Sequence, residues 1–177
     1  MSKDLKRVKE LDWIDEIRTG LGGKITARFL DGEVDMQGNK VALCSYPRSG
    51  NSLTRKLLEQ ISGIATGCES KSDLTLQMVG MVGESHSGSD RIWVTKTHHP
   101  LDSGPICRQF VSNKQIYLMR NPIDMIPSHA LLMQTASHGL VPNEKFDVDF
   151  PNFWEDWVHF SIGKIKAFHD HVINVSS

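Results

Sequence analysis

The stretch from residue 41 to residue 58 constrains the fold more than any other part of the chain. The apolar run Val41–Cys44 predicts a buried strand, and Pro47 and Gly50 then predict a tight turn. A helix is predicted to follow at once, with Ser52 as its N-cap. In α/β proteins this order often makes a phosphate site, because the loop N–H groups and the helix N-terminus point at one anion. Many strand-to-helix turns contain serine and glycine for geometry alone, so the loop needs support from elsewhere in the chain.

The helix after this loop is predicted to be amphipathic, with one apolar side and one charged side. The apolar side is expected to pack on the sheet and the charged side to face water. The predicted buried residues are Leu53, Leu57, Leu58 and Ile61, and the predicted exposed residues are Arg55, Lys56 and Glu59.

Residues 91–96 predict a second strand, and residues 115–119 predict a third. The second strand leads directly into the sequence Thr97-His98-His99-Pro100, so that Lys96 and His98 fall at its carboxyl end. Open α/β sheets bind their ligands at this edge. His98 is therefore a candidate general base, while His99 is expected to face the other way and to flank an acceptor pocket.

The third strand is followed by a strong helix-start signal. Asn121 is predicted to be the N-cap, Pro122 the first helical residue and Asp124 an acidic residue of the first turn. Arg120 then lies beside a helix N-terminus, and Ser128 lies about two turns into that helix. Both side chains are within reach of one phosphate placed over the helix start.

Three strand ends thus deliver polar side chains to the same edge of the predicted sheet. The first supplies Arg48 and its loop, the second supplies Lys96 and His98, and the third supplies Arg120 and Ser128. We expect these groups to surround one anionic ligand.

The remaining chain divides into an N-terminal region, residues 1–39, and a single domain, residues 40–177. The first contains a predicted amphipathic helix over residues 2–19 and a possible hairpin over residues 25–36. Residues 62–90 are rich in serine and glycine and predict one short helix flanked by surface loop, which includes Glu84 and His86. A long helix is predicted from about Pro151.

Composition narrows the class of protein. The 177 residues suffice for one domain, and the formal net charge of −1 excludes a chain-wide basic field for nucleic acid. No apolar run is long enough to span a bilayer, and no secretory signal is visible. Three scattered cysteines are typical of a reducing compartment, so a cytoplasmic location is expected, with Cys44 as a small core residue.

Three motifs, taken together, resemble those of the sulfotransferase family that uses 3′-phosphoadenosine 5′-phosphosulfate (PAPS). Residues 46–52, Y-P-R-S-G-N-S, resemble the family's 5′-phosphosulfate loop, commonly Y-P-K-S-G-T-T-W. Residues 96–100, K-T-H-H-P, resemble its K-T-H-x-P around a catalytic histidine. Residues 120–128 resemble its R-N-x-x-D-x-x-x-S segment, which holds the donor's 3′-phosphate. The order and intervals also fit, and the resemblance covers about residues 40–172.

The resemblance implies a three-layer α/β/α fold of the P-loop NTPase type, with a parallel sheet. It implies PAPS as donor without a metal, and as acceptor a hydroxyl or amine of a small molecule, a glycan or a protein. The implied catalytic residues are His98 as general base, with Lys96 and Arg48 stabilising the transition state. The implied donor-binding residues are Arg48, Ser49, Gly50, Asn51, Ser52, Arg120 and Ser128.

The chain also departs from the family pattern. Arg48 replaces the usual lysine, and Asn51 and Leu53 replace threonine and tryptophan. The family's later G-x-x-G-x-x-K segment is absent, so the chain is expected to be a fragment or a truncated form whose fold is incomplete at the C-terminal end. Two alternatives follow: a non-catalytic module that binds the nucleotide, or a P-loop kinase-like protein, which would need a Walker lysine and a Mg²⁺-binding aspartate.

Overall fold

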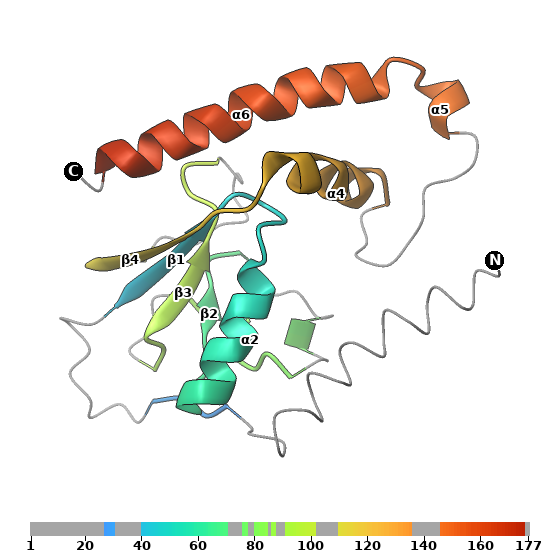
Figure 1. Ribbon diagram of the computed structural model, residues 1–177. Coiled ribbons are helices and arrows are strands. Elements are labelled where there is room, and N and C mark those ends of the chain that lie inside the picture. Colours follow the sequence, from blue (N-terminus) through green and yellow to red (C-terminus); the bar gives the residue numbers. More distant parts are fainter. Residues whose placement is uncertain are drawn as a thin grey trace.

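Four parallel strands form one sheet in the order β2-β3-β1-β4 (Figure 1). The computed structural model describes residues 27–30, 40–70, 76–77, 80–84, 86–87, 91–101, 110–135 and 146–175. The strands are β1 (Val41–Ser45), β2 (Gly67–Cys68), β3 (Val94–Thr97) and β4 (Lys114–Leu118). The chain therefore has the α/β class expected from the sequence, with β1 in the interior of the sheet.

The described helices are α2 (Asn51–Ser62), α4 (Pro122–Thr135), α5 (Phe146–Asp149) and α6 (Phe153–Val175). Three of them, α2, α4 and α6, pack on the sheet and cover both of its faces. Leu58 of α2 packs with Leu43 and its neighbours on one face. Tyr117 of β4 packs against Met125 of α4 and Phe168 of α6 on the other face. Leu43 and Tyr117 point to opposite faces because Tyr117 lies opposite Cys44, the residue after Leu43.

The three strands predicted from the sequence are confirmed as β1, β3 and β4, with end points that differ by up to three residues. β2 was not predicted, because two residues in a stretch rich in glycine and serine have no apolar periodicity. The helix expected over residues 2–19 lies outside the described residues, as does most of the hairpin expected over 25–36. Within that hairpin, Arg28 is described and makes a parallel bridge to Ile64.

The start of α4 agrees with the predicted capping chemistry. Asn121 accepts a hydrogen bond at its side-chain oxygen from the N–H of Ile123, at 3.0 Å, and Asp124 lies in the first turn. The start of α2 does not agree. Its N-cap is Gly50 in the left-handed conformation, and Ser52 is already inside the helix.

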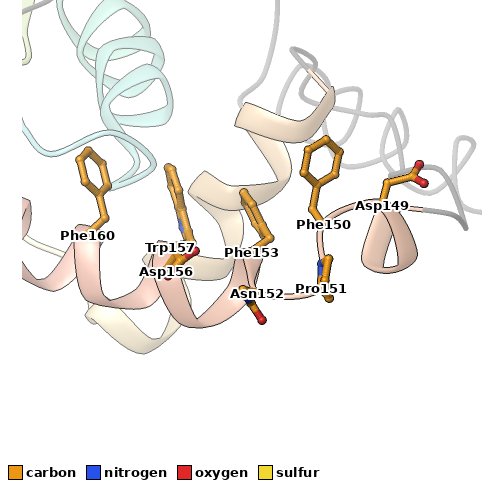
Figure 2. A pocket seen from close by; sticks show the side chains of 8 residues that line it. All are labelled: Asp149, Phe150, Pro151, Asn152, Phe153, Asp156, Trp157 and Phe160. Atoms are coloured by element: carbon orange, nitrogen blue, oxygen red, sulfur yellow. The ribbon is translucent and has the colours of Figure 1, made fainter.

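The long helix predicted from about Pro151 is confirmed as α6, which begins at Phe153. Where α5 meets α6, aromatic rings lie along one side of α6 and border an open groove (Figure 2). Its lining is Asp149, Phe150, Pro151, Asn152, Phe153, Asp156, Trp157 and Phe160. None of the helices that the structure describes has the length and apolar character needed to cross a bilayer.

The orientation of α2 is opposite to the predicted one. Arg55 and Glu59 are fully buried, whereas Leu53 is 44% exposed and Ile61 is 83% exposed. The polar side faces inward because it finds partners there: Arg55 donates hydrogen bonds to Thr66 and forms an ion pair with Glu84. The predicted burial pattern of this helix was therefore wrong for most of the named positions, while Leu58 packs against the core as predicted. The surface position expected for Glu84 was also wrong, because Glu84 is 1% exposed.

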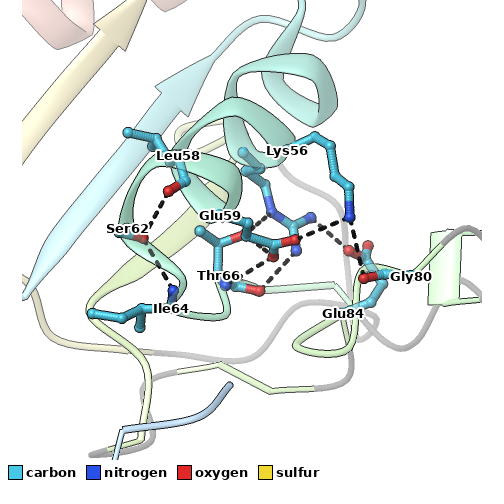
Figure 3. Close-up of polar contacts among 9 residues, drawn as sticks. Lys56, Leu58, Glu59, Ser62, Ile64, Thr66, Gly80 and Glu84 are labelled. Atoms are coloured by element: carbon cyan, nitrogen blue, oxygen red, sulfur yellow. Dashed lines mark hydrogen bonds and ion pairs between the residues drawn. The ribbon is translucent and has the colours of Figure 1, made fainter. Parts of the chain in front are cut away.

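Thr66 joins the two buried charged residues of α2 (Figure 3). The Thr66 hydroxyl accepts from Arg55 Nε at 2.9 Å and donates to Glu59 Oε1 at 2.8 Å. The N–H of Thr66 donates to the same Glu59 oxygen at 3.0 Å. The cluster of Arg55, Glu59, Thr66 and Glu84 therefore pairs most of its buried charged atoms internally, which lowers the cost of burying them. Glu59 Oε2 is buried without a hydrogen bond, and its nearest cation is Lys56 Nζ at 3.7 Å.

Candidate functional site

The loop between β1 and α2 presents unpaired backbone donors. Thr54 makes the first hydrogen bond of the helix, to the carbonyl oxygen of Gly50 at 3.0 Å, and no side chain caps the N-terminus. The N–H groups of residues 51–53 therefore have no acceptor within the helix. Arg48 and Gly50 both have left-handed backbone conformations, with φ of 69° and 93°. Such a loop followed by a helix N-terminus is suited to an anion.

Asn51 and Ser49 anchor the loop with their side chains. Asn51 donates from Nδ2 to the carbonyl oxygen of Leu43 at 3.0 Å and to the hydroxyl of Ser45 at 2.9 Å. The Ser49 hydroxyl lies 3.1 Å from the sulfur of Met125 in α4. For Asn51, the backbone N–H is thus the group available to a ligand, while the side chain fixes the start of α2 to β1. Ser52 is half-buried at the second position of the helix.

Arg48, Arg120 and Ser128 meet at the carboxyl ends of β1 and β4. Arg48 donates from Nε to the hydroxyl of Ser128 at 2.8 Å, and Arg120 donates from Nη1 to the backbone carbonyl of Arg48 at 3.0 Å. The loops after β1 and β4 lead to helices on opposite faces of the sheet, so the boundary between these two strands is the switch point at which open α/β sheets bind their ligands in a crevice. The structure therefore brings together residues 72 and 80 positions apart in the chain.

His98 lies at the same edge, immediately after β3. Its Nδ1 is 2.6 Å from the carbonyl oxygen of Ser45, the last residue of β1. Because a carbonyl oxygen only accepts, Nδ1 is assigned as the protonated nitrogen, and Nε2 then carries the lone pair. Burial of the imidazole, helped by the charge of Lys96, lowers the pKa of His98 from 6.5 to about 4. The ring is therefore neutral at pH 7, and Nε2 is the nitrogen that can accept a proton. A pKa of about 4 makes it a weaker base than the near-neutral group that is most efficient at pH 7.

Lys96 lies inside β3 with its side chain half-buried. It is aligned with Leu43 of β1 and with Cys68 of β2, which places it on the face of the sheet that α2 covers. Burial raises the pKa of Cys68 and the positive charge of Lys96 opposes this rise, whereas for His98 burial lowers the pKa and the same charge lowers it further. The structure thus places Lys96 near His98, as the sequence predicted.

Two residues at this edge were not selected from the sequence. Glu69, just after β2, is buried and accepts a hydrogen bond from the N–H of His98 at 2.6 Å. The sequence around Glu69 did not indicate a site residue, because β2, the strand that Glu69 follows, was not predicted. His129 follows Ser128 in α4, and its pKa is lowered by burial and by the charge of Arg48. Its position directly after Ser128, a predicted site residue, was the sequence feature that could have indicated it.

Three other histidines of the described chain contact aromatic rings, and Cys44 is a buried thiol. His171 of α6 makes an edge contact with the ring of His99, and His169 makes one with Tyr117, at centroid distances of 5.1 and 5.5 Å. Burial raises the pKa of Cys44 to about 11, so this thiol is protonated and not a nucleophile at pH 7. Cys107 lies outside the described residues.

Two depressions in the protein surface differ in whether they contain predicted site residues. The aromatic groove of Figure 2 contains none of Arg48, His98, Arg120 or Ser128. A second depression includes Arg120; its other lining residues are Met119, Pro122, Ile162, Ile165, Lys166 and His169. Within the described residues, no three His, Cys, Asp or Glu side chains are grouped as a metal site would require.

The site's chemistry is therefore that of an anion site beside a neutral imidazole. Uncapped N–H groups and two guanidinium groups lie at the carboxyl ends of β1 and β4, and His98 carries the lone pair of Nε2 at the next strand end. Comparisons of the chain with protein-family models, with curated proteins and with solved structures found no match.

Proposed function

We propose that the chain is a sulfotransferase that moves the sulfuryl group of PAPS to an acceptor hydroxyl or amine, on a sulfotransferase fold of the P-loop NTPase type. One observation carries the proposal. Arg48, Arg120 and Ser128 come from two of the three motifs, and Arg48 is hydrogen-bonded to each of the other two at the carboxyl edge of the sheet. His98, from the third motif, is held at the end of the adjacent strand.

In this proposal the two phosphate-bearing ends of the donor occupy different parts of the crevice. The N–H groups at the start of α2 bind the 5′-phosphosulfate, and Arg120 and Ser128 bind the 3′-phosphate. Arg48 already donates to Ser128. A bound 3′-phosphate would therefore share or replace that hydrogen bond, which couples the loop to donor binding.

The transfer step needs an in-line nucleophile and stabilised negative charge. A bond forms between the acceptor oxygen or nitrogen and sulfur, while the bond between sulfur and the bridging oxygen of the 5′-phosphate breaks. The acceptor's proton goes to Nε2 of His98, and the leaving nucleotide keeps the bonding electrons. Lys96 and Arg48 stabilise the charge that develops on the sulfuryl and bridging oxygens.

Titration with adenosine 3′,5′-bisphosphate, in buffer without divalent metal, tests the binding half of the proposal. We expect saturable one-to-one binding by calorimetry and no dependence on Mg²⁺. Arg120→Ala removes a charge-assisted hydrogen bond of about 1.5–3 kcal/mol and should weaken binding roughly 10- to 150-fold. Arg91→Ala is the matched control, because Arg91 is also exposed but precedes β3 at the opposite edge of the sheet. Binding of ATP that requires Mg²⁺ would instead favour the kinase alternative.

Turnover with labelled PAPS and a panel of phenols, alcohols, amines and glycans tests the catalytic half. His98→Ala should reduce kcat by about 100- to 10,000-fold while changing donor affinity little. Equal losses of donor affinity in His98→Ala and Arg120→Ala would contradict the assigned roles. Tight binding of the bisphosphate without turnover on any acceptor would leave the non-catalytic binding module as the function.

A further inference from the structure

We infer that Glu69 is the positioning residue for the His98 imidazole, and that it acts through the backbone at the end of β3. The inference deepens the proposed function and rests on it for its catalytic consequence. Its structural part, which concerns how the His98 ring is held, can be tested without any substrate.

The parallel register places Glu69 beside the residues it contacts. Cys68 is aligned with Lys96, so Glu69 comes opposite Thr97 at the carboxyl edge of the sheet. Its own N–H donates to the carbonyl oxygen of Lys96 at 3.0 Å, which continues the ladder by one step. The Glu69 side chain lies against the carboxyl end of β3, where it is only 7% exposed.

The carboxylate accepts from two donors at the end of β3. Oε1 accepts from the N–H of His98 at 2.6 Å, and Oε2 accepts from the hydroxyl of Thr97. That hydroxyl in turn accepts from the N–H of His99 at 2.9 Å, so its own hydrogen is directed to Glu69. One carboxylate therefore satisfies, directly or through Thr97, the N–H groups of both histidines that follow the strand.

The His98 ring is consequently fixed from two neighbouring strands. Glu69, after β2, holds its backbone N–H, and the carbonyl oxygen of Ser45, in β1, holds its Nδ1 at 2.6 Å. Because the backbone N–H and the Nδ1 atom of His98 are both held, the direction in which Nε2 points is fixed. A general base must be within hydrogen-bond reach of the proton that it takes, so this fixed direction determines its efficiency.

Three variants separate positioning from general stability. Glu69→Ala removes both acceptors, and Thr97→Val removes the hydroxyl while keeping the side-chain shape. Glu69→Gln keeps one acceptor but presents an NH₂ group in place of the second. The matched control is Glu59→Gln, because Glu59 is also buried and also accepts from a backbone N–H and a threonine hydroxyl, both of Thr66.

The first readout is nitrogen-15 NMR of the histidine rings in the free protein, with the His98 signals assigned from their loss in His98→Asn. The wild-type chain should show His98 with Nδ1 protonated. Glu69→Ala and Thr97→Val should give a mixture of the two tautomers or a broadened Nδ1–H signal, and Glu69→Gln a smaller change. Glu59→Gln should lower the urea midpoint and leave the His98 spectrum as in the wild type.

The second readout is kinetic, for acceptor turnover with PAPS. Glu69→Gln should lower kcat by about 10- to 100-fold and keep the Km for the donor within about twofold. An unchanged His98 spectrum in folded Glu69→Gln and Thr97→Val would overturn the inference whatever the activity. A changed spectrum in a protein whose wild type neither binds the bisphosphate nor turns over PAPS would keep the positioning and reject the proposed function.

Discussion

Replacing Arg55 with methionine should be among the most destabilising single changes in the described part of the chain. Arg55 is fully buried and pairs with Glu84, which is 1% exposed, at an Nη1–Oε2 distance of 2.5 Å. It also donates to the hydroxyl and the carbonyl oxygen of Thr66, at 2.9 and 3.0 Å. Methionine fills most of the volume but leaves the Glu84 carboxylate buried without its cation, at a cost of about 3–5 kcal/mol.

Urea unfolding followed by circular dichroism measures this cost. A domain of ordinary stability unfolds with about 5–15 kcal/mol, and m values run from about 1 to 3 kcal/mol/M in urea. The midpoint of Arg55→Met should therefore fall by about 2 M. Lys166→Met is the matched control for loss of an ion pair, because Lys166 and Asp170 pair at 2.7 Å but are 76% and 56% exposed. Its midpoint should stay close to that of the wild type.

A double-mutant cycle decides whether the unpaired Glu84 carboxylate causes the loss of stability. Adding Glu84→Met to Arg55→Met removes the unpaired carboxylate and should recover most of the stability, since buried ion pairs can be replaced by apolar residues at little cost. A loss of less than about 1 kcal/mol for Arg55→Met, or losses that simply add when the two substitutions are combined, would show that the unpaired Glu84 carboxylate is not the cause.

Two further predictions follow from the site and from α2. The pKa of His98 is lowered from 6.5 to about 4, so between these values the unfolded chain binds a proton that the folded chain does not, and stability should fall as the pH drops from 6.5 towards 4. His98→Asn should flatten this dependence in urea midpoints measured from pH 4.5 to 7; an equally steep profile in the variant would contradict the assignment. Ile61 is 83% exposed, so Ile61→Ser should change stability by less than about 0.5 kcal/mol, whereas Glu59→Ala should cost about 1–3 kcal/mol by leaving Thr66 without its acceptor. The opposite ranking of those two midpoints would restore the orientation predicted from the apolar spacing.

Local chemistry in the sequence was sufficient to predict the elements that carry the site. The apolar run of β1, the turn at Gly50 and the cap at Asn121 each depend on neighbours within a few residues, and each is present. The convergence of Arg48 with Ser128 followed from one further rule, that parallel strands present their carboxyl ends at a common edge.

The orientation of α2 could not be predicted in the same way. Leucine and isoleucine spacing favours one side, but Arg55 and Glu59 are also spaced by four residues and share a side of their own. Which side is buried depends on Thr66 and Glu84, and the position of Glu84 in space cannot be read from the helix sequence. Hydrophobic spacing fails to predict the buried side of such a helix, because a buried polar cluster is stabilised by partners distant in the sequence.

The strand β2 and the site residue Glu69 were missed for a single cause, which also explains how the sheet positions the residues at this edge. β2 has two residues, too few for an alternating pattern, yet its register with β3 fixes where Glu69 falls. The aligned pairs Cys44 with Thr97 and Ser45 with Leu118 then place the residues that follow each strand at one level. A slip of one residue in β2 would turn Glu69 to the other face and leave the N–H of His98 without its acceptor. The geometry around His98 therefore depends on the shortest strand of the sheet. For this reason the sequence motifs identify the His98 imidazole but not the Glu69 carboxylate that holds it.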